Sequence, residues 1–214
     1  MAAAPAVEDR PKVWRLVVAQ LKVAVLVSHT GSNSRALHEA SLRDDAGFGI
    51  CLVVSNNSGA RALEYAREQG IPSRHMSVRT HGTPEELDAA LLDELVTRGV
   101  DLVVTAGYMK KLGPRTLAAY ENRIINIHPS LLPRHGGPGM YGMAVHEAVL
   151  ATGDEVTGAS VHHVTAEYDA GEVIARREVP VMAGDTAEGL AARVLAVEHQ
   201  LLPEVVRRIA AGKG

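Results

Sequence analysis

The residues of this chain that most clearly suggest chemistry lie in the stretch IINIHPSLLPRHGG, residues 124–137. Asn126 and His128 alternate there with apolar residues. Because side chains two positions apart in a strand point to the same face, the amide and the imidazole are predicted to project together. An amide N–H can hold a developing oxyanion and an imidazole can transfer a proton, which are the needs of an acyl transfer. The alternative is that each is a buried polar group satisfied by neighbouring backbone.

A second stretch that suggests binding chemistry is VSHTGSNSRAL, which follows an apolar run and opens a helical pattern. Gly31 stands before Ser32 and Asn33, so backbone N–H groups at a helix N-terminus can surround an anion, and the stretch predicts a phosphate site. It is neither GxGxxG nor a Walker loop, which argues against a dinucleotide or a nucleoside triphosphate. The alternative is a helix cap in which the side chain of Ser32 or Asn33 bonds to the first turn.

Alternating strands and helices must position these stretches. From Lys22 onward, continuous apolar runs alternate with amphipathic segments, a pattern typical of a parallel sheet with helices on both faces. The predicted strands are KVAVLVS, GICLVVS, IPSRHMSV, DLVVTAG and RIINIHP, and the predicted helices are SRALHEASLRDD, ARALEYAREQG, TPEELDAALLDELVTRG and PRTLAAYEN. Thr83, Pro84 and Glu86 are expected to form a capping box on the third of these helices. The predicted fold class is α/β, with a doubly wound and mostly parallel sheet.

The pattern changes after Pro133. A glycine-rich loop leads to the helical stretch MAVHEAVLATG, and two strands between residues 158 and 182 are expected to add to the sheet as an antiparallel pair. A long C-terminal helix follows, for which Asp185 and Glu188 are the expected capping pair. We expect the strand order of the sheet to reverse near the strand that ends at His128.

The predicted topology brings the chemical stretches together. In a doubly wound sheet, ligands collect beyond the carboxyl ends of the strands, so residues 29–33, 106–110 and 126–130 are expected to share one rim. Asp169 lies in the loop between the last two strands and can close over that rim. Together with Asn126 and His128 it would serve an acyl transfer without a covalent intermediate, its carboxylate raising the pKa of the histidine.

Composition limits the remaining function classes. The chain has 214 residues and a formal net charge of -3, so there is no general attraction for nucleic acid or for an anionic membrane. No apolar run approaches the length of a membrane span. Residues 1–20 lack the features of a secretory signal and are expected to be an irregular N-terminal extension. The one cysteine, Cys51, excludes an internal disulfide, and we therefore expect a cytoplasmic protein.

Several motifs in register then carry a resemblance. NIHPSLLP, a glycine-rich loop and SVHHVTAEYDAGEVI, together with SHTGSN, VVTAGYMKKL and ARVLAVEH, resemble the formyltransferases that use 10-formyltetrahydrofolate, and among them those that act on glycinamide ribonucleotide. The similarity runs from about Lys22 to about Gly212. It implies a Rossmann-like formyltransferase fold over residues 21–214, a single domain with a phosphate-binding N-terminal half and a folate-binding and catalytic C-terminal half.

The resemblance also implies a reaction. The formyl group of 10-formyltetrahydrofolate, a co-substrate, would pass to the amine of glycinamide ribonucleotide in de novo purine synthesis, by direct attack through a tetrahedral intermediate. No metal is expected, and the protein would be a monomer or a homodimer that binds these small molecules and no nucleic acid or membrane.

Site residues follow from the resemblance position by position. The matched catalytic residues are Asn126, His128 and Asp169, with His162 as a supporting histidine. The matched substrate-binding residues are Gly31, Ser32 and Asn33 for the phosphate and Glu198 for the ribose hydroxyls. The matched folate-binding residues are Met109, Lys110, Leu112, Val164, Thr165, Ala166 and Glu167. His163 falls where the family often has an apolar residue and is expected to be exposed, and a cis peptide is expected between Leu132 and Pro133.

Alternatives remain at this point. Relatives with the same central motif include methionyl-tRNA formyltransferase, sugar formyltransferases and formyltetrahydrofolate deformylase. A nucleotide-binding module without chemistry would use SHTGSN alone. A metal hydrolase would need ligands from His128, His162, His163 and His199, but the HH and EH pairs lack the ligand spacing of motifs such as HExxH. His29 and Thr30 depart from the phosphate loop of many family members, and Arg79 or Lys110 is the candidate basic partner for a phosphate.

Overall fold

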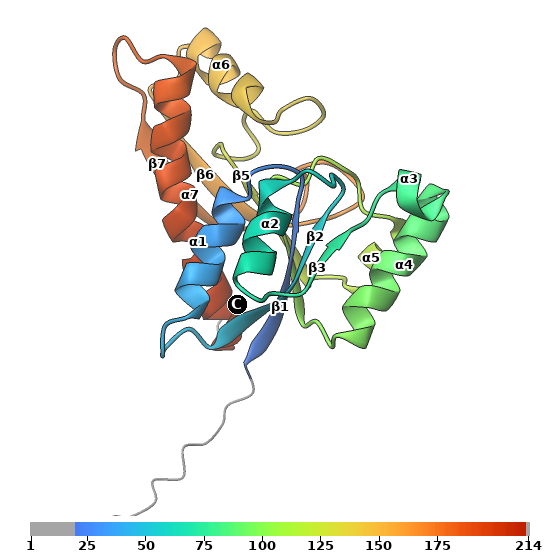
Figure 1. Ribbon diagram of the computed structural model, residues 1–214. Coiled ribbons are helices and arrows are strands. Elements are labelled where there is room, and N and C mark those ends of the chain that lie inside the picture. The colour runs from blue at the N-terminus through green and yellow to red at the C-terminus, as the bar shows by residue number, and fades with distance from the viewer. Residues whose placement is uncertain (1–19, 213–214) are drawn as a thin grey trace, which may run out of the picture.

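The computed structural model describes residues 20–212, which form one seven-stranded sheet with helices on both faces (Figure 1). The strands are β1 (Leu21–Val27), β2 (Phe48–Ser55), β3 (Ser73–His75), β4 (Leu102–Thr105), β5 (Ile124–His128), β6 (Val156–His163) and β7 (Val173–Pro180). The helices are α1 (Ser32–Ser41), α2 (Arg61–Glu68), α3 (Val78–His81), α4 (Pro84–Thr97), α5 (Pro114–Ala119), α6 (Met143–Thr152) and α7 (Ala187–Ala210). The expected N-terminal extension lies outside the described residues.

The strand order is β3-β2-β1-β4-β5-β6-β7, with parallel pairing from β3 to β5 and antiparallel pairing of β6 and β7. The predicted doubly wound sheet with an antiparallel C-terminal addition is therefore confirmed. The predicted place of the order reversal is wrong, because the order reverses between β1 and β4. Beyond β5 the strand direction changes instead, because β6 pairs antiparallel with β5 after the long connection that contains α6.

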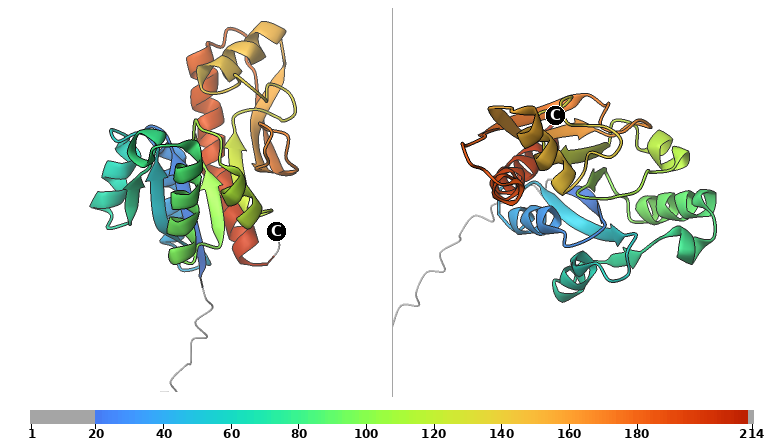
Figure 2. Two further views of the ribbon diagram at one scale, coloured as in Figure 1. Left: turned by 90° about the vertical axis from the view of Figure 1, so that its right-hand side faces the viewer. Right: turned by 90° about the horizontal axis from the view of Figure 1, so that it is seen from above.

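The alternation of side chains along β1 explains why helices cover both faces. Val23 and Val25 belong to the core cluster shared with α1 and α7, whereas Ala24 and Leu26 belong to the cluster shared with α4. All of these side chains are fully buried. Figure 2 shows the same division, with α1 and α7 on one side of the sheet and α4 on the other. A continuous apolar strand is thus required, because neither face of it meets water.

Local capping signals explain the boundaries of α4. The Thr83 side chain accepts a hydrogen bond from the Glu86 N–H at 3.2 Å, and the Glu86 side chain accepts one from the Thr83 N–H at 2.9 Å. Pro84 occupies the first helical position, where its missing N–H costs nothing. The predicted capping box is confirmed.

Two local predictions differ from the structure. The stretch IPSRHMSV contains the short strand β3 as expected, but it also leads into α3, which has its own capping box between Ser77 and Thr80. The N-cap of α7 is Thr186, whose side chain accepts from the Gly189 N–H at 3.1 Å. Asp185 does not cap the helix, because its carboxylate is already engaged by Arg193 and by the Met182 N–H.

Two further features of residues 20–212 bear on function. The peptide bond between Leu132 and Pro133 is cis, as expected. None of the helices in this part of the chain is long and apolar enough to cross a membrane.

Candidate active site

Strand register builds the centre of the site. Thr105 of β4 pairs with Asn126 of β5, and Asn126 pairs with His162 of β6. Residues directly opposite in neighbouring strands point to the same face, so the three side chains form one row across the sheet. They lie on the face covered by α4, because the flanking residues Ile125 and Val161 pack into the opposite core cluster.

The row holds the Asn126 amide in one orientation. The Thr105 hydroxyl donates to the amide oxygen at 2.8 Å, and the amide nitrogen lies 3.0 Å from Nε2 of His162. Nδ1 of His162 lies 2.8 Å from the backbone carbonyl of His163 and donates to it, so Nε2 of the neutral ring accepts from the amide, and only in the charged ring does Nε2 donate to Asp169 instead. One N–H of Asn126 thereby remains without a partner in the described part of the chain and is available to an oxyanion.

His128 is buried at the end of β5, two residues beyond Asn126. Its Nε2 lies 2.8 Å from the His135 carbonyl oxygen, and its Nδ1 lies 3.6 Å from Oδ2 of Asp169. Burial lowers the pKa of His128 below its ordinary value, although the charge of Asp169 and the His135 carbonyl both favour the protonated ring. Asp169 thus raises the pKa of His128 as expected, but desolvation of the imidazolium outweighs the carboxylate and the net shift is downward.

Asp169 links the two histidines. Its Oδ1 lies 3.4 Å from Nε2 of His162, and its Oδ2 also accepts from the Gly137 N–H at 2.9 Å. Burial raises the pKa of Asp169, but the His162 ring, the His128 ring and the Gly137 N–H outweigh burial and hold the pKa below its ordinary value. Asp169 has a φ of 53°, a left-handed conformation in which aspartate is one of the less strained residues. The carboxylate is thus ionised and aimed at the two rings.

The predicted anion loop precedes α1. Gly31 is the N-cap with a φ of 70°, and an added Cβ would lie 2.6 Å from the Ala62 Cβ of α2. Only glycine meets both requirements without strain. Within residues 20–212 no side chain caps the first turn of α1, so the interpretation of Ser32 or Asn33 as a capping residue is wrong. The N–H groups of that turn remain available to an anion.

Asn33 instead connects the loop to the C-terminal helix. Its Nδ2 donates to Oε2 of Glu198 at 2.5 Å, and its Oδ1 is buried without a hydrogen-bond partner in the described residues. Burial raises the pKa of Glu198, and the hydrogen bond from Asn33 opposes the rise. The structure thereby places side by side two residues that sequence resemblance had assigned to a phosphate and to ribose hydroxyls.

The segments after β4 and β6 also meet. Lys111 donates to the Ala166 carbonyl at 3.0 Å and lies over the Tyr168 ring at 4.7 Å. Ser28, at the end of β1, accepts from the Met109 N–H at 2.8 Å and donates to the Asn56 side chain. The exposed residues among those expected beside a folate are Met109, Lys110, Thr165, Ala166 and Glu167, whereas Leu112 and Val164 are partly buried. These segments form an open polar rim.

Sequence reasoning missed several residues of this site. Thr105, Ser28 and His135 had no motif that distinguished them, although a threonine opposite Asn126 could have been found once the β4–β5 register was known. His163 is partly buried rather than exposed, because its Nδ1 is enclosed. Arg79 and Lys110, the candidate basic partners of a phosphate, are both exposed.

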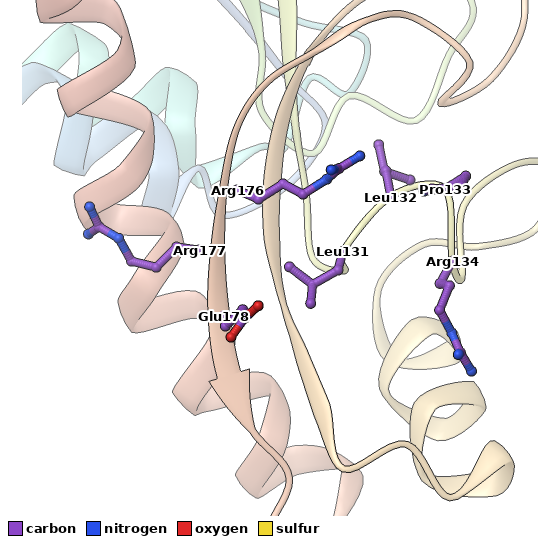
Figure 3. Close-up of a pocket in the computed structure, with 7 residues that line it drawn as sticks. All are labelled: Leu131, Leu132, Pro133, Arg134, Arg176, Arg177 and Glu178. Carbon is purple, nitrogen blue, oxygen red and sulfur yellow. The ribbon is translucent and has the colours of Figure 1, made fainter.

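No group of three or more His, Cys, Asp or Glu side chains within residues 20–212 is arranged to hold a metal ion. A hollow of about 680 Å³ lies beside the turn that follows β5 (Figure 3). Residues 131–134 line one side of it and residues 176–178 of β7 line the other. None of the residues discussed above as catalytic lines this hollow.

Comparison with known proteins places the chain in a family. The profile of the formyl transferase family matches residues 21–206. A chloroplastic phosphoribosylglycinamide formyltransferase from Vigna unguiculata is 44% identical over 203 residues, which is 94% of this chain and 65% of the relative. The phosphoribosylglycinamide formyltransferase of Escherichia coli is 38% identical over 193 residues, which is 90% of this chain and 89% of the relative. The chain spans slightly less than two thirds of the length of the plant relatives, at 65% for both Vigna unguiculata and Arabidopsis thaliana.

Solved structures agree with the sequence relatives. The crystal structure of phosphoribosylglycinamide formyltransferase from Brucella melitensis superposes with a TM-score of 0.83 at 38% identity, covering 90% of this chain and 97% of that one. Glycinamide ribonucleotide transformylase 1 from Symbiobacterium toebii gives a TM-score of 0.84, also at 38% identity, covering 90% of this chain and 89% of that one.

Proposed function

Because the chain belongs to the formyl transferase family, we propose that it transfers the formyl group of 10-formyltetrahydrofolate to the amine of glycinamide ribonucleotide, a step of de novo purine synthesis. The relatives named for this reaction include the Escherichia coli protein, 89% of whose length is covered by the match. The alternatives are another 10-formyltetrahydrofolate-dependent formyltransferase and a deformylase, in which water replaces the amine.

The observation that carries the proposal is the oriented Asn126 amide beside His128 and Asp169. Thr105 and His162 hold the amide so that one N–H stays free, and His128 follows on the same face of β5. A neutral amide donor beside an imidazole and a carboxylate is the equipment for a tetrahedral oxyanion and a proton transfer. None of these three side chains is proposed as a nucleophile, because the substrate amine attacks the formyl carbon directly.

The proposed reaction proceeds in two bond changes. The amine nitrogen attacks the formyl carbon, and the formyl oxygen becomes an oxyanion that accepts from the Asn126 amide and is stabilised by the positive charge of His128 when that ring is protonated. The attacking nitrogen, which carries a positive charge after the attack, then loses a proton, and the bond between the formyl carbon and the folate nitrogen breaks as the folate nitrogen takes a proton. His128 relays this proton, because its pKa is low enough for a neutral ring and Asp169 stabilises the ring when it becomes charged.

The two substrates would approach from different sides of the rim. The first turn of α1 would hold the phosphate of glycinamide ribonucleotide through Gly31, Ser32 and Asn33, and Glu198 would bind the ribose hydroxyls. The connection from Asn33 to Glu198 supports adjacent phosphate and ribose positions. The folate would lie along residues 109–112 and 164–167, which Lys111 draws together.

The domain organisation and compartment are also proposals. We treat residues 21–214 as one formyltransferase domain, with the phosphate site in its N-terminal half and the folate and catalytic residues in its C-terminal half. One continuous seven-stranded sheet runs through both halves, which supports treating them as a single domain. We propose a cytoplasmic location from the single cysteine, while the plant relatives are named chloroplastic.

The direct test is an assay of the purified chain with both substrates. We expect tetrahydrofolate and formylated glycinamide ribonucleotide to appear together in equal amounts, and neither to appear without the amine. Release of formate with glycinamide ribonucleotide left unmodified would favour the deformylase. Transfer to a different amine alone would favour another formyltransferase.

A further inference from the structure

A short backbone segment contacts both His128 and Asp169. The His135 carbonyl oxygen lies 2.8 Å from Nε2 of His128, and the Gly137 N–H donates to Oδ2 of Asp169 at 2.9 Å. Between them, Gly136 packs so closely that an added Cβ would overlap the Leu132 side chain and lie 3.2 Å from the Asp169 Cβ. The backbone of residues 135–137 therefore contacts both His128 and Asp169 and restrains them. We call these three residues the clamp segment.

The clamp segment determines which nitrogen of His128 carries the proton. A carbonyl oxygen only accepts, so Nε2 must be the donor and a neutral His128 must have its lone pair on Nδ1. That lone pair faces Asp169 at 3.6 Å. A proton that reaches the ring is then held on the side where the carboxylate stabilises it. Without the carbonyl, no other group in the described residues bonds to Nε2, and the Asp169 carboxylate would favour a proton on Nδ1 instead.

Asp154 holds the clamp segment in place. Nε2 of His135 donates to Oδ2 of Asp154 at 2.7 Å, and the side chains are only 10% and 12% exposed. Asp154 follows α6 in the chain. His135 has a φ of 53°, which a non-glycine residue adopts only when its surroundings hold it there. The ring contact with Asp154 supplies that restraint.

Arg134 also contacts Asp154 but contributes differently. Its guanidinium pairs with the other carboxylate oxygen, and the side chain is 65% exposed. Figure 3 shows this side chain directed toward α6, away from the strand that carries His128. An exposed ion pair of this kind stabilises little and does not touch the catalytic ring.

We propose that His135 and Asp154 are positioning residues for His128: the Asp154 carboxylate anchors the His135 ring, and the His135 carbonyl holds the proton of neutral His128 on Nε2. The proposal rests on the proposed function for the role of His128 in formyl transfer. The tautomer itself is a property of the free protein and is measurable without any substrate.

The test uses the full chain labelled with 15N in its histidines. Long-range 1H–15N correlation spectra at a pH above the His128 pKa distinguish the Nε2–H and Nδ1–H forms, and His128→Asn identifies the His128 signals. We expect the Nε2–H form in the native chain and a mixture of both forms in Asp154→Ala. The kcat for formyl transfer should fall about 10-fold, the effect of about one hydrogen bond, with KM for glycinamide ribonucleotide unchanged.

Matched variants separate positioning from general damage. Asp154→Asn keeps an oxygen acceptor for His135 and should retain the Nε2–H form, and Arg134→Ala should leave it unchanged. If Asp154→Ala fails to fold, His135→Asn replaces it, because asparagine tolerates a positive φ but is too short to reach Asp154.

Each remaining outcome decides the matter. An unchanged Nε2–H form in Asp154→Ala or His135→Asn overturns the proposal, and so does an equal mixture in Arg134→Ala, which would indicate loss of the loop rather than of the anchor. If the native chain fails to formylate glycinamide ribonucleotide, the proposed function is wrong. The tautomer measurement uses no substrate, so it tests the role of His135 and Asp154 independently of that result.

Discussion

Replacement of Asn126 by alanine tests the oxyanion role most directly. The variant removes the free N–H and leaves Thr105 and His162 in place. Loss of one oxyanion donor typically lowers turnover about 100- to 1000-fold, or about 2.7–4 kcal/mol of transition-state stabilisation. Asn126 is only partly buried, so the free energy of unfolding should fall by no more than about 1–2 kcal/mol and the protein should stay folded.

Thr105 allows a finer test, because it acts on the reaction only through Asn126. Thr105→Val removes the hydroxyl that donates to the amide oxygen at 2.8 Å. A single neutral hydrogen bond is worth about 1 kcal/mol, so turnover should fall about 5-fold. In a chain that already carries Asn126→Ala, the same Thr105→Val change should have almost no further effect, since residues in one network are not additive.

The assay is the initial rate of tetrahydrofolate formation with both substrates saturating, for the native chain, both single variants and the double variant. Calorimetric titration with glycinamide ribonucleotide should give nearly equal affinities throughout, and circular dichroism should show intact folding. If turnover of Asn126→Ala stays within about 10-fold of the native value, the amide has only a structural role, because loss of an oxyanion donor lowers turnover by more than about 10-fold. An equal loss from Thr105→Val in both backgrounds would show that Thr105 acts elsewhere.

Three further predictions follow from contacts of the described residues. Asn33→Ala should weaken calorimetric binding of glycinamide ribonucleotide much more than that of folate, because Asn33 belongs to the proposed phosphate site, and equal losses would contradict this. Asp169→Asn removes the charge that raises the pKa of His128, so that pKa falls further and the acidic limb of turnover against pH should move to lower pH; an unmoved limb would disprove the coupling. Asp88→Ala should lower the free energy of unfolding by about 2–4 kcal/mol in urea, since the buried carboxylate accepts from the Arg115 N–H at 2.8 Å and the Thr116 N–H at 3.0 Å. A loss below about 0.5 kcal/mol would show that α5 finds another cap.

Local physics explains which features could be predicted from the sequence. The period of two in a strand placed Asn126 and His128 on one face, and the structure agrees, because Ile125 and Ile127 both pack in the core cluster on the opposite face. Thr83 and Glu86 stand three residues apart, so their capping box depends only on neighbouring backbone. The continuous apolar runs required two covered faces whatever the order of the strands.

Some predictions of helix caps were wrong because side chains that could cap a helix bond to other residues instead. Asp185 and Thr186 are adjacent and both suit an N-cap, but Thr186 caps the helix because Arg193, about two turns further along, engages the Asp185 carboxylate. The first turn of α1 gave a similar ambiguity. Asn33 does not cap it, because Gly31 is the N-cap and Asn33 lies inside the helix, where its Nδ2 donates to Glu198, 165 residues away in the chain.

The sequence by itself determined the elements, the faces of the strands and the residue types that can do chemistry, because these depend on neighbours along the chain. Only the tertiary structure decided that Asp169 meets both His128 and His162, and that the His135 carbonyl contacts the His128 ring. It also decided the sign of the His128 pKa shift, since the depth of burial is a property of the packed whole and here exceeds the effect of the carboxylate that the sequence had made visible.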